Sequence, residues 1–167
     1  TNTLALMSAI KRTNLRRGED HHEWPRTALF DKIGARSVVL ETDAFGNFVI
    51  TGFDYATARD WARLGQFFLQ DGHWQGEQLW PEGWSDVIKT PSSANPEYGG
   101  QVWVNLHRDW PALPADAYSF SGWLQQHVVI IPSRSLVIVR LGFSEGEGFD
   151  PYFNTLLQKI LDAVPSN

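Results

Sequence analysis

The stretch SFSGWLQQHVVIIPSRSLVIVRLG, residues 119–142, decides the fold of this chain. It contains two apolar runs, residues 128–131 and 136–141, which are separated by a tight turn at residues 132–135. Continuous apolar runs of this length, bounded by turn residues, are typical of strands that are covered on both faces. The stretch therefore predicts a β-hairpin. Ser121 and Gly122 lie at the turn through which the chain enters it.

Helical patterns lie on both sides of this hairpin. The clearest covers residues 58–70, with Thr57 as the expected N-cap and Asp60 three residues later, as in a capping box. A terminal helix is predicted at residues 150–164, with Asp150 as its cap. Further helices are predicted at residues 1–12, 24–30 and 81–88, and one further strand at residues 98–106.

The order of these elements predicts an α+β fold, in which an antiparallel sheet of three strands is flanked by helices. Residues 1–97 are expected to be mostly helical, and residues 98–142 to hold the three strands. A chain of 167 residues is long enough for one domain or for part of a larger one.

Composition excludes several classes of function. The net charge of −5 argues against a nucleic-acid partner, because such proteins need a basic face. No run of eighteen apolar residues predicts a membrane span. The chain has no cysteine, which excludes disulfides and a cysteine nucleophile. His21, His22 and Glu23 could bind a metal, but a solvated turn is the simpler interpretation. We therefore expect neither a metal nor another cofactor.

Several segments, taken in their order and spacing, resemble the serine β-lactamase and penicillin-binding-protein-like superfamily. The closest resemblance is to the β-lactamase-related esterases and amidases. The matching segments are residues 54–72, 76–84, 98–104, 131–134 and 137–142, within a region that runs from about residue 28 to 165. The resemblance implies that residues 1–167 form the carboxyl-terminal part of a β-lactamase-like domain.

In this family a Ser-x-x-Lys pair and a Tyr carry out catalysis, and a third motif lines the cleft. The resemblance places that third motif at Phe120, Ser121 and Gly122. It implies that the backbone N–H of Trp123 is one oxyanion-hole donor, and that Ser121, Phe120 and Gln126 contact the substrate.

Two residues depart from the family pattern. Phe120 stands where a cationic Lys is frequent, and Gln125 stands where Gly is usual. Since Phe carries no charge, recognition of an anionic β-lactam carboxylate is in doubt. An ester or amide substrate agrees better with these residues.

The nucleophile is expected in a missing amino-terminal half of the same protein, so that this chain alone is expected to be inactive. Ser8 and Lys11 do form a literal Ser-x-x-Lys pattern on a predicted helix. The family, however, places two strands and a helix before that motif, whereas seven residues precede Ser8 here. A solvated helix face is the simpler interpretation, and a minimal enzyme that uses this pair is the third alternative.

The first functional hypothesis is therefore the carboxyl-terminal part of a serine hydrolase that acts on esters, amides or β-lactam-like rings through an acyl-enzyme. The second is a binding or structural module of the same fold without catalysis. The expected partners are a small-molecule substrate and the missing half of the protein. A sheet edge exposed near Gly142 would also favour a homodimer. The resemblance is compatible with a periplasmic or secreted protein, but the sequence does not fix the compartment.

Overall fold

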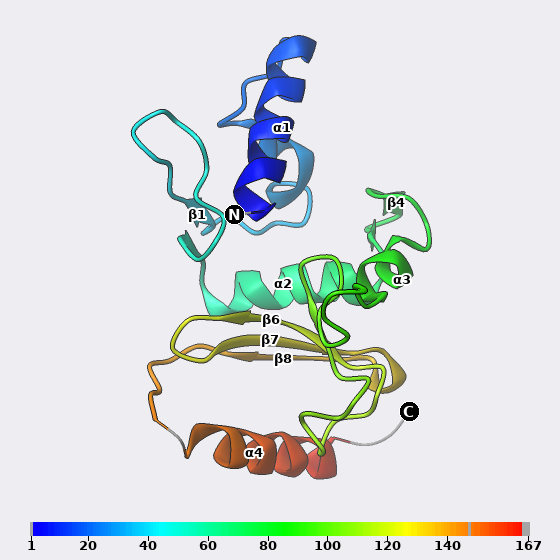
Figure 1. Cartoon of the computed structure of the whole chain (residues 1–167). Helices are drawn as coiled ribbons and strands as arrows, with labels where there is room; N and C mark the ends of the chain where they lie inside the picture. The colour runs from blue at the N-terminus through cyan, green and yellow to red at the C-terminus, as the bar shows by residue number, and fades with distance from the viewer. Residues whose placement is uncertain (1, 147, 165–167) are drawn as a thin grey trace. The chain divides into compact units, whose positions relative to one another are not determined.

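The computed structural model describes residues 2–146 and 148–164. The chain divides into two units, Thr1–Leu64 and Gly65–Asn167. Figure 1 shows their elements along the chain. Among the described residues, no helix has both the length and the apolar character that crossing a membrane requires.

The first unit is built from helices and short strands. It contains helix α1 (Asn2–Arg17), a π-helical turn (Arg26–Phe30), strands β1 (Val39–Leu40) and β2 (Asp54–Tyr55), and the start of helix α2 (Ala58–Leu69). The two strands pair antiparallel, with Val39 opposite Tyr55. The helix predicted at residues 1–12 therefore extends further, and the one predicted at residues 24–30 is a single π-type turn.

Helix α2 begins as the sequence predicts. The Thr57 carbonyl accepts a hydrogen bond from Trp61 N at 3.0 Å, and Thr57 Oγ1 accepts a weaker one from Asp60 N at 3.4 Å. Asp60 does not reach back to Thr57 as in a simple capping box. Its carboxylate instead accepts bonds from Ser37 N and Ser37 Oγ, at 2.8 and 2.6 Å, and Ser37 Oγ accepts a bond from Thr57 N. A serine from the preceding loop thus completes the cap.

The second unit contains an antiparallel sheet of four strands in the order β5-β6-β7-β8. The strands are β5 (Trp103–Val104), β6 (Tyr118–Gly122), β7 (Gln126–Ile131) and β8 (Leu136–Arg140). The unit also contains the short hairpin of β3 (His73–Trp74) and β4 (Glu77–Gln78), helix α3 (Trp84–Lys89) and the terminal helix α4 (Phe149–Ala163).

The prediction of three strands was wrong, because the chain before the hairpin is itself a strand. Strand β6 pairs along its whole length with β7, and Tyr118 lies opposite Ile130. Its two serines have little strand preference of their own, and pairing with an apolar neighbour decides its conformation. The strand predicted at residues 98–106 is reduced to the two residues of β5.

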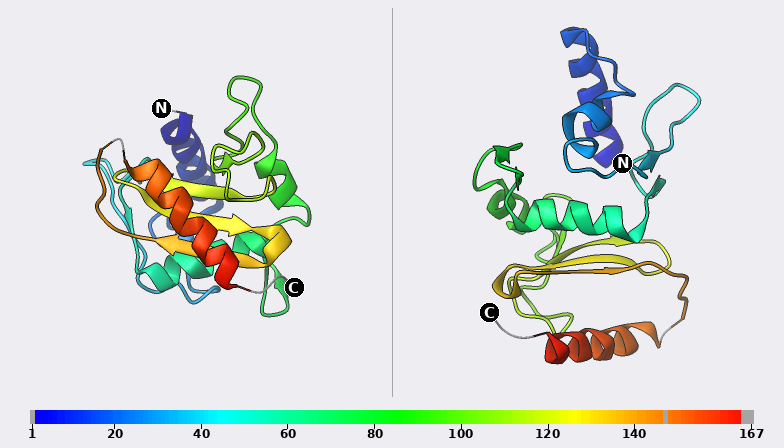
Figure 2. Two further views of the ribbon diagram at one scale, coloured as in Figure 1. Left: turned by 90° about the horizontal axis from the view of Figure 1, so that it is seen from below. Right: turned by 180° about the vertical axis from the view of Figure 1, so that it is seen from behind.

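Helices cover both faces of this sheet. Residues 65–69 of α2 lie on one face, and Figures 1 and 2 show α4 on the other. A side chain at Gly65 would place its Cβ 2.6 Å from Val137 Cγ1 and 3.0 Å from Val128 Cγ1. Both are stiff β-branched side chains, so the absence of a side chain at Gly65 is what lets α2 approach the sheet so closely.

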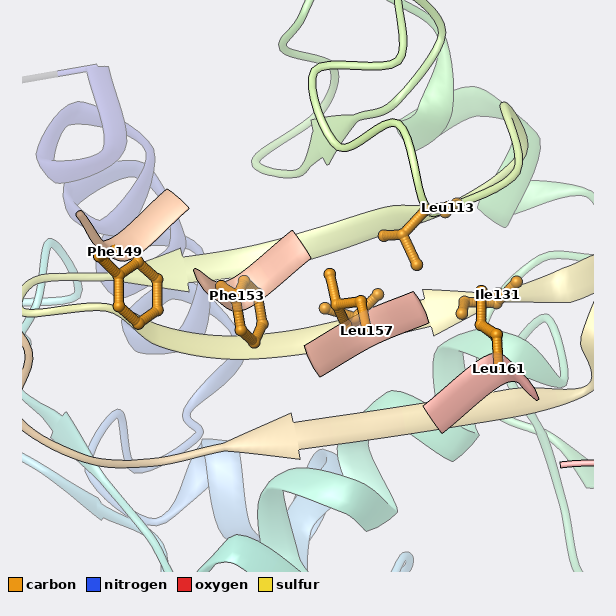
Figure 3. Packing of buried hydrophobic residues seen from close by; sticks show 8 residues of the cluster. Leu113, Ile131, Phe149, Phe153, Leu157 and Leu161 are labelled. Carbon is orange, nitrogen blue, oxygen red and sulfur yellow. The ribbon is translucent and has the colours of Figure 1, made fainter. Parts of the chain in front are cut away.

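The main core of the unit lies between the sheet and α4, as Figure 3 shows. Leu157 of α4 is fully buried, as are Val129 and Ile131 of β7. The inward residues of the helix recur every four positions, at Phe149, Phe153, Leu157 and Leu161. The predicted cap of this helix was wrong, since Gly148 is the N-cap and Asp150 lies in the first turn without a capping bond.

Candidate functional site

The β6–β7 hairpin positions every residue of the predicted third motif. Gly122 pairs with Gln126 as the last pair of the ladder, and residues 123–125 form the turn. Leu124 and Gln125 have φ angles of 57° and 69°, in the left-handed region that side chains rarely adopt. Trp123, at the start of this turn, is 85% exposed. Its side chain and its backbone N–H therefore lie at the tip of the hairpin.

Alternation along β6 separates two residues that the sequence placed in one site. Phe120 points to the α2 face, where its ring meets that of Phe68 with centroids 4.8 Å apart. Ser121 points to the α4 face, because successive side chains of a strand alternate. The two residues therefore do not share one surface. Their roles as substrate contacts stay predictions, and on this geometry Ser121 is the better placed of the two.

Ser121 takes part in a chain of hydrogen bonds across the hairpin. Its Oγ lies 3.1 Å from Nδ1 of His127, the residue opposite it in the ladder. The other ring nitrogen of His127, Nε2, lies 3.0 Å from Oε1 of Gln125. Because an amide oxygen only accepts, Nε2 carries the hydrogen and Nδ1 must accept. Ser121 therefore donates its hydroxyl hydrogen to His127.

His127 is almost completely enclosed, with 5% of its surface exposed. Its ring stacks on Phe153 at 4.6 Å between centroids and meets the edge of Trp110 at 5.2 Å. Burial lowers the pKa of His127 to about 4, with a further contribution from the positive charge of Arg140 and a small opposing one from Asp150. The imidazole is therefore neutral near pH 7 and able to accept the bond from Ser121.

A pocket of about 500 Å³ lies beside Ser121 and His127. Its lining includes the indoles of Trp103 and Trp110 and the carboxylates of Glu97, Asp109 and Asp150, and all of these belong to the second unit. A concave site with aromatic walls and a few polar groups is the usual form of a small-molecule site.

One wall of the pocket is held in place by Asn105, which is 5% exposed. Its Nδ2 donates to the carbonyls of Trp110, Leu113 and Pro114, each at 3.2 Å, and its Oδ1 accepts from Trp110 N at 3.0 Å. A single buried amide thus organises the proline-containing loop between β5 and β6. No local pattern marks Asn105 in the sequence, because its partners lie five to nine residues further along the chain.

Gln126 uses its amide within the sheet. Its Nε2 donates to Gly142 O at 2.6 Å, and its Oε1 accepts from Gly142 N at 2.9 Å. These two bonds extend the β7–β8 ladder beyond its last regular pair. An added Cβ at Gly122 would lie 3.3 Å from Cβ of Gln126, which is closer than an ordinary van der Waals contact. Substrate contact by Gln126 and oxyanion binding at Gly122 and Trp123 stay predictions.

Ser8 and Lys11 lie on α1 in the first unit. Lys11 Nζ donates to Phe45 O at 2.9 Å, to Gly46 O at 3.1 Å and to Asn47 Oδ1 at 3.0 Å. The ammonium therefore closes the loop at residues 43–47, and Ser8 is exposed on the helix. In residues 2–146 and 148–164 there is no group of three or more His, Cys, Asp or Glu side chains arranged to hold a metal ion.

The sequence interpretation missed the roles of His127 and Gln125. The register of the hairpin pairs Ser121 with His127, and the turn between the two strands consists of residues 123–125, so that Gln125 is its last residue. Turns of this kind are usually marked by Gly or Asn, and here two ordinary side chains take the left-handed positions. If a three-residue turn had been assumed after Gly122, counting residue pairs back from that turn would have placed His127 opposite Ser121.

No protein-family model matches the chain, and no curated protein matches it either. Solved structures do. A protein named as a 6-aminohexanoate-dimer hydrolase from Bacillus anthracis is 23% identical, with a TM-score of 0.70 over 89% of this chain and 40% of its own. A β-lactamase from Mycobacterium bovis is 12% identical, with a TM-score of 0.72 over 96% of this chain and 61% of its own.

A third similar structure, of a protein described as a β-lactamase from Bacteroides dorei, is 13% identical, with a TM-score of 0.61 over 90% of this chain and 53% of its own. The chain thus spans between two fifths and three fifths of the length of these three structures. At these identities the likeness shows the fold.

Proposed function

We propose, from the β-lactamase-like fold that this chain shares with those structures, that it forms the carboxyl-terminal part of a serine hydrolase. The reaction would be hydrolysis of an ester, an amide or a β-lactam-like ring through an acyl-enzyme. The preceding part of the same protein would supply the Ser, Lys and Tyr. This chain would supply the strand along which the substrate lies and one donor to the oxyanion.

The observation that carries the proposal is the position of Gly122 and Trp123 at the end of β6, next to the pocket that Ser121 lines. In acyl transfer, a serine oxygen bonds to the substrate carbonyl carbon while the π electrons of the carbonyl move to its oxygen. Backbone N–H groups fixed at the end of a strand stabilise that oxyanion without reorganising. The resemblance assigns this role to the N–H of Trp123, the residue that directly follows β6.

The charges around the motif support an ester or amide substrate over an anionic one. Phe120 packs on Phe68 and contributes no charge. Arg140 contacts the turn: it donates to Gln125 O and Gly142 O and to the hydroxyl of Ser144, and its guanidinium lies over the Phe149 ring at 4.9 Å. Three of the five N–H donors of this guanidinium are therefore used within the protein.

The proposal is tested with a fluorophosphonate probe, which labels only an activated serine. We expect the protein with its preceding segment to be labelled, and the 167-residue chain alone to remain unlabelled. Labelling of the short chain that is lost in Ser8→Ala would instead support the minimal enzyme. Binding of small ligands without labelling of the longer protein would favour the non-catalytic module, which the Gln125 departure also supports.

The oxyanion donor has a sharper test in the longer protein. Trp123→Pro removes the backbone N–H, whereas Trp123→Ala removes the indole and keeps the N–H. We expect kcat for ester hydrolysis to fall about 100-fold to 1,000-fold in the proline variant, as for other lost oxyanion donors. The alanine variant should lose much less. Equal losses in the two variants would show that the side chain matters and the N–H does not.

A further inference from the structure

The turn between β6 and β7 begins at the proposed oxyanion donor and continues in an unfavourable backbone conformation. Leu124 and Gln125, two consecutive residues with side chains, have φ angles of 57° and 69°. Residues other than Gly rarely take this left-handed region, and those that do persist where the surrounding structure holds them. Trp123, whose backbone N–H is the proposed donor, directly precedes this pair. The direction of that N–H therefore depends on the contacts that hold the turn.

Both left-handed residues are held from beyond the hairpin. The carbonyl of Leu124 accepts a hydrogen bond from Ser144 N at 3.2 Å, and the carbonyl of Gln125 accepts one from Arg140 Nη1 at 2.5 Å. The same nitrogen of Arg140 donates to Gly142 O at 3.0 Å, and its Nη2 donates to the Ser144 hydroxyl. One guanidinium at the end of β8 thus joins the turn to the segment that follows β8.

The guanidinium of Arg140 is itself fixed by the main core of the second unit. It lies over the Phe149 ring at 4.9 Å, and that ring is 7% exposed and stacks on Phe153. Among the described residues Arg140 takes part in no salt bridge, and its bonds go to backbone carbonyls and a hydroxyl. A planar guanidinium can stack and donate in several fixed directions at once, which a Lys ammonium cannot do. Arg140 therefore ties the turn to the core.

Two contacts from within the hairpin complete the arrangement. Gln126 Nε2 donates to Leu124 O at 3.3 Å, and Gln125 Oε1 accepts from His127 Nε2 at 3.0 Å. Gln125 is thus held through its side chain as well as through its carbonyl. The bond from Arg140 to that carbonyl has a charged donor, and charge-assisted hydrogen bonds are stronger than neutral ones. We therefore expect the loss of Arg140 to affect the turn more than the loss of either amide contact.

We infer that Arg140 is a positioning residue for the proposed hydrolysis, which holds the β6–β7 turn so that the Trp123 N–H meets the oxyanion without moving. Arg140 acts through that N–H and contacts no substrate atom. Donors that are fixed in advance stabilise developing charge because they need no reorganisation during the reaction. The catalytic part of the inference rests on the proposed function. The holding of the turn does not, and it can be measured on this chain.

The first experiment measures the order of the turn in the 167-residue chain. Arg140→Met keeps an aliphatic stem and removes the guanidinium. We expect the NMR order parameters of residues 123–125 to fall from about 0.85, the value of rigid backbone, to below about 0.6. Slow hydrogen exchange in β7 should persist, which shows that the fold is intact. Unchanged order in the turn would overturn the inference.

Two further variants make this measurement specific. Arg140→Lys keeps the charge with fewer donors and should give an intermediate order, and it replaces Arg140→Met in the comparison if the latter does not fold. Arg134→Met is the matched control. Arg134 donates to Leu161 O at 2.9 Å and to Val164 O at 2.7 Å, so that it holds the end of α4 and not the turn. Equal loss of order at residues 123–125 in Arg134→Met would refute a specific role of Arg140.

The second experiment measures hydrolysis of p-nitrophenyl acetate by the longer protein. Arg140→Met should lower kcat about tenfold to 100-fold and leave KM within about twofold, because a misplaced oxyanion donor affects the transition state and not substrate binding. Arg140→Lys should recover part of the loss, and Arg134→Met should leave both constants unchanged. A rise in KM at unchanged kcat would make Arg140 a binding residue, and an equal fall of kcat in Arg134→Met would assign the effect to general stability. Either result contradicts a positioning role.

A double-mutant cycle tests whether Arg140 acts through the Trp123 N–H. In Trp123→Pro this N–H is absent, so a further Arg140→Met change should lower kcat less than about twofold. Losses that multiply in full would show that Arg140 acts elsewhere and would overturn the inference. If the longer protein neither hydrolyses esters nor is labelled at a serine, the proposed function fails together with the catalytic role of Arg140. If it hydrolyses esters and Arg140→Met leaves kcat unchanged, this inference alone fails.

Discussion

Burial shifts the pKa of His127 in the second unit and of Asp54 in the first, and the two side chains differ in how well the protein satisfies their hydrogen-bonding groups. In the second unit, both ring nitrogens of His127 have hydrogen-bond partners, and the ring stacks on Phe153. In the first unit, Asp54 of β2 is partly buried, and its Oδ1 has no hydrogen-bond partner among the described residues. Burial alone raises the pKa of Asp54 to about 6.

The difference shows how burial acts on a base and on an acid. In both cases the low dielectric disfavours the charged form, so the histidine loses affinity for its proton and the carboxyl keeps it. The neutral form of His127 near pH 7 leaves no hydrogen bond unmade, because both Ser121 and Gln125 bond to this neutral tautomer. Asp54 is ionised near pH 7 in a place that opposes ionisation. We therefore expect protonation of His127 to weaken the second unit, and protonation of Asp54 to remove an unfavourable charge from the first.

The largest effect tests whether the second unit has a core of its own. Leu157→Ala removes a fully buried side chain between α4 and the sheet. We expect the free energy of unfolding of this unit to fall by about 2 to 5 kcal/mol. Hydrogen exchange should become faster in β7 and α4 and stay unchanged in α1. The exposed Lys159→Ala on the same helix is the control, and faster exchange in α1 as well would contradict separate units.

The next effect is the pH dependence at His127. Its folded pKa of about 4 lies below its usual value of 6.5, so its contribution to stability is complete above pH 6.5 and is lost as the pH falls toward 4. The loss can reach about 3 kcal/mol. Urea unfolding at a series of pH values should show this loss in the wild type and not in His127→Gln. Parallel pH profiles of the two proteins would mean that His127 does not titrate differently on folding.

The smallest effect has the opposite sign and belongs to the first unit. The folded pKa of Asp54 is raised above 3.8, so its penalty is absent below pH 3.8 and complete above about pH 6. Asp54→Asn should therefore stabilise the first unit by about 1 kcal/mol at pH 7 and have almost no effect near pH 4. Exposed Glu41→Gln in the same unit is the control. A loss of stability at pH 7 would show that the Asp54 carboxylate has a partner that favours its charged form.

Much of the fold is predictable from local pattern. The start of α2, the β7–β8 hairpin with its turn, and the terminal helix all follow from apolar periodicity and from turn or capping residues. Strand β6 was missed although residues 118–121 alternate between apolar and polar, because this pattern is only four residues long and the turn after it lacks Gly and Asn at its left-handed positions. The cap of α4 was wrong by two residues, an ordinary error at a helix end.

The candidate site was predictable only in part. The sequence singled out Ser121, which lines the pocket. It joined Phe120 to the same surface, although alternation along a strand sends the two side chains to opposite faces. Had β6 been recognised, that separation would have followed from its period of two residues.

The sequence by itself determined the class of fold, an antiparallel sheet with helices, and the β7–β8 hairpin that the candidate motif precedes in the chain. These follow from interactions between residues close in the chain, whose spacing is visible in the letters. Only the tertiary structure decided that His127 and Gln125 hold the Ser121 hydroxyl, that Asn105 fixes the neighbouring loop, and that Glu97, Asp109 and Asp150 meet in one pocket. Those contacts depend on strand register and on packing between distant segments, which no local pattern specifies.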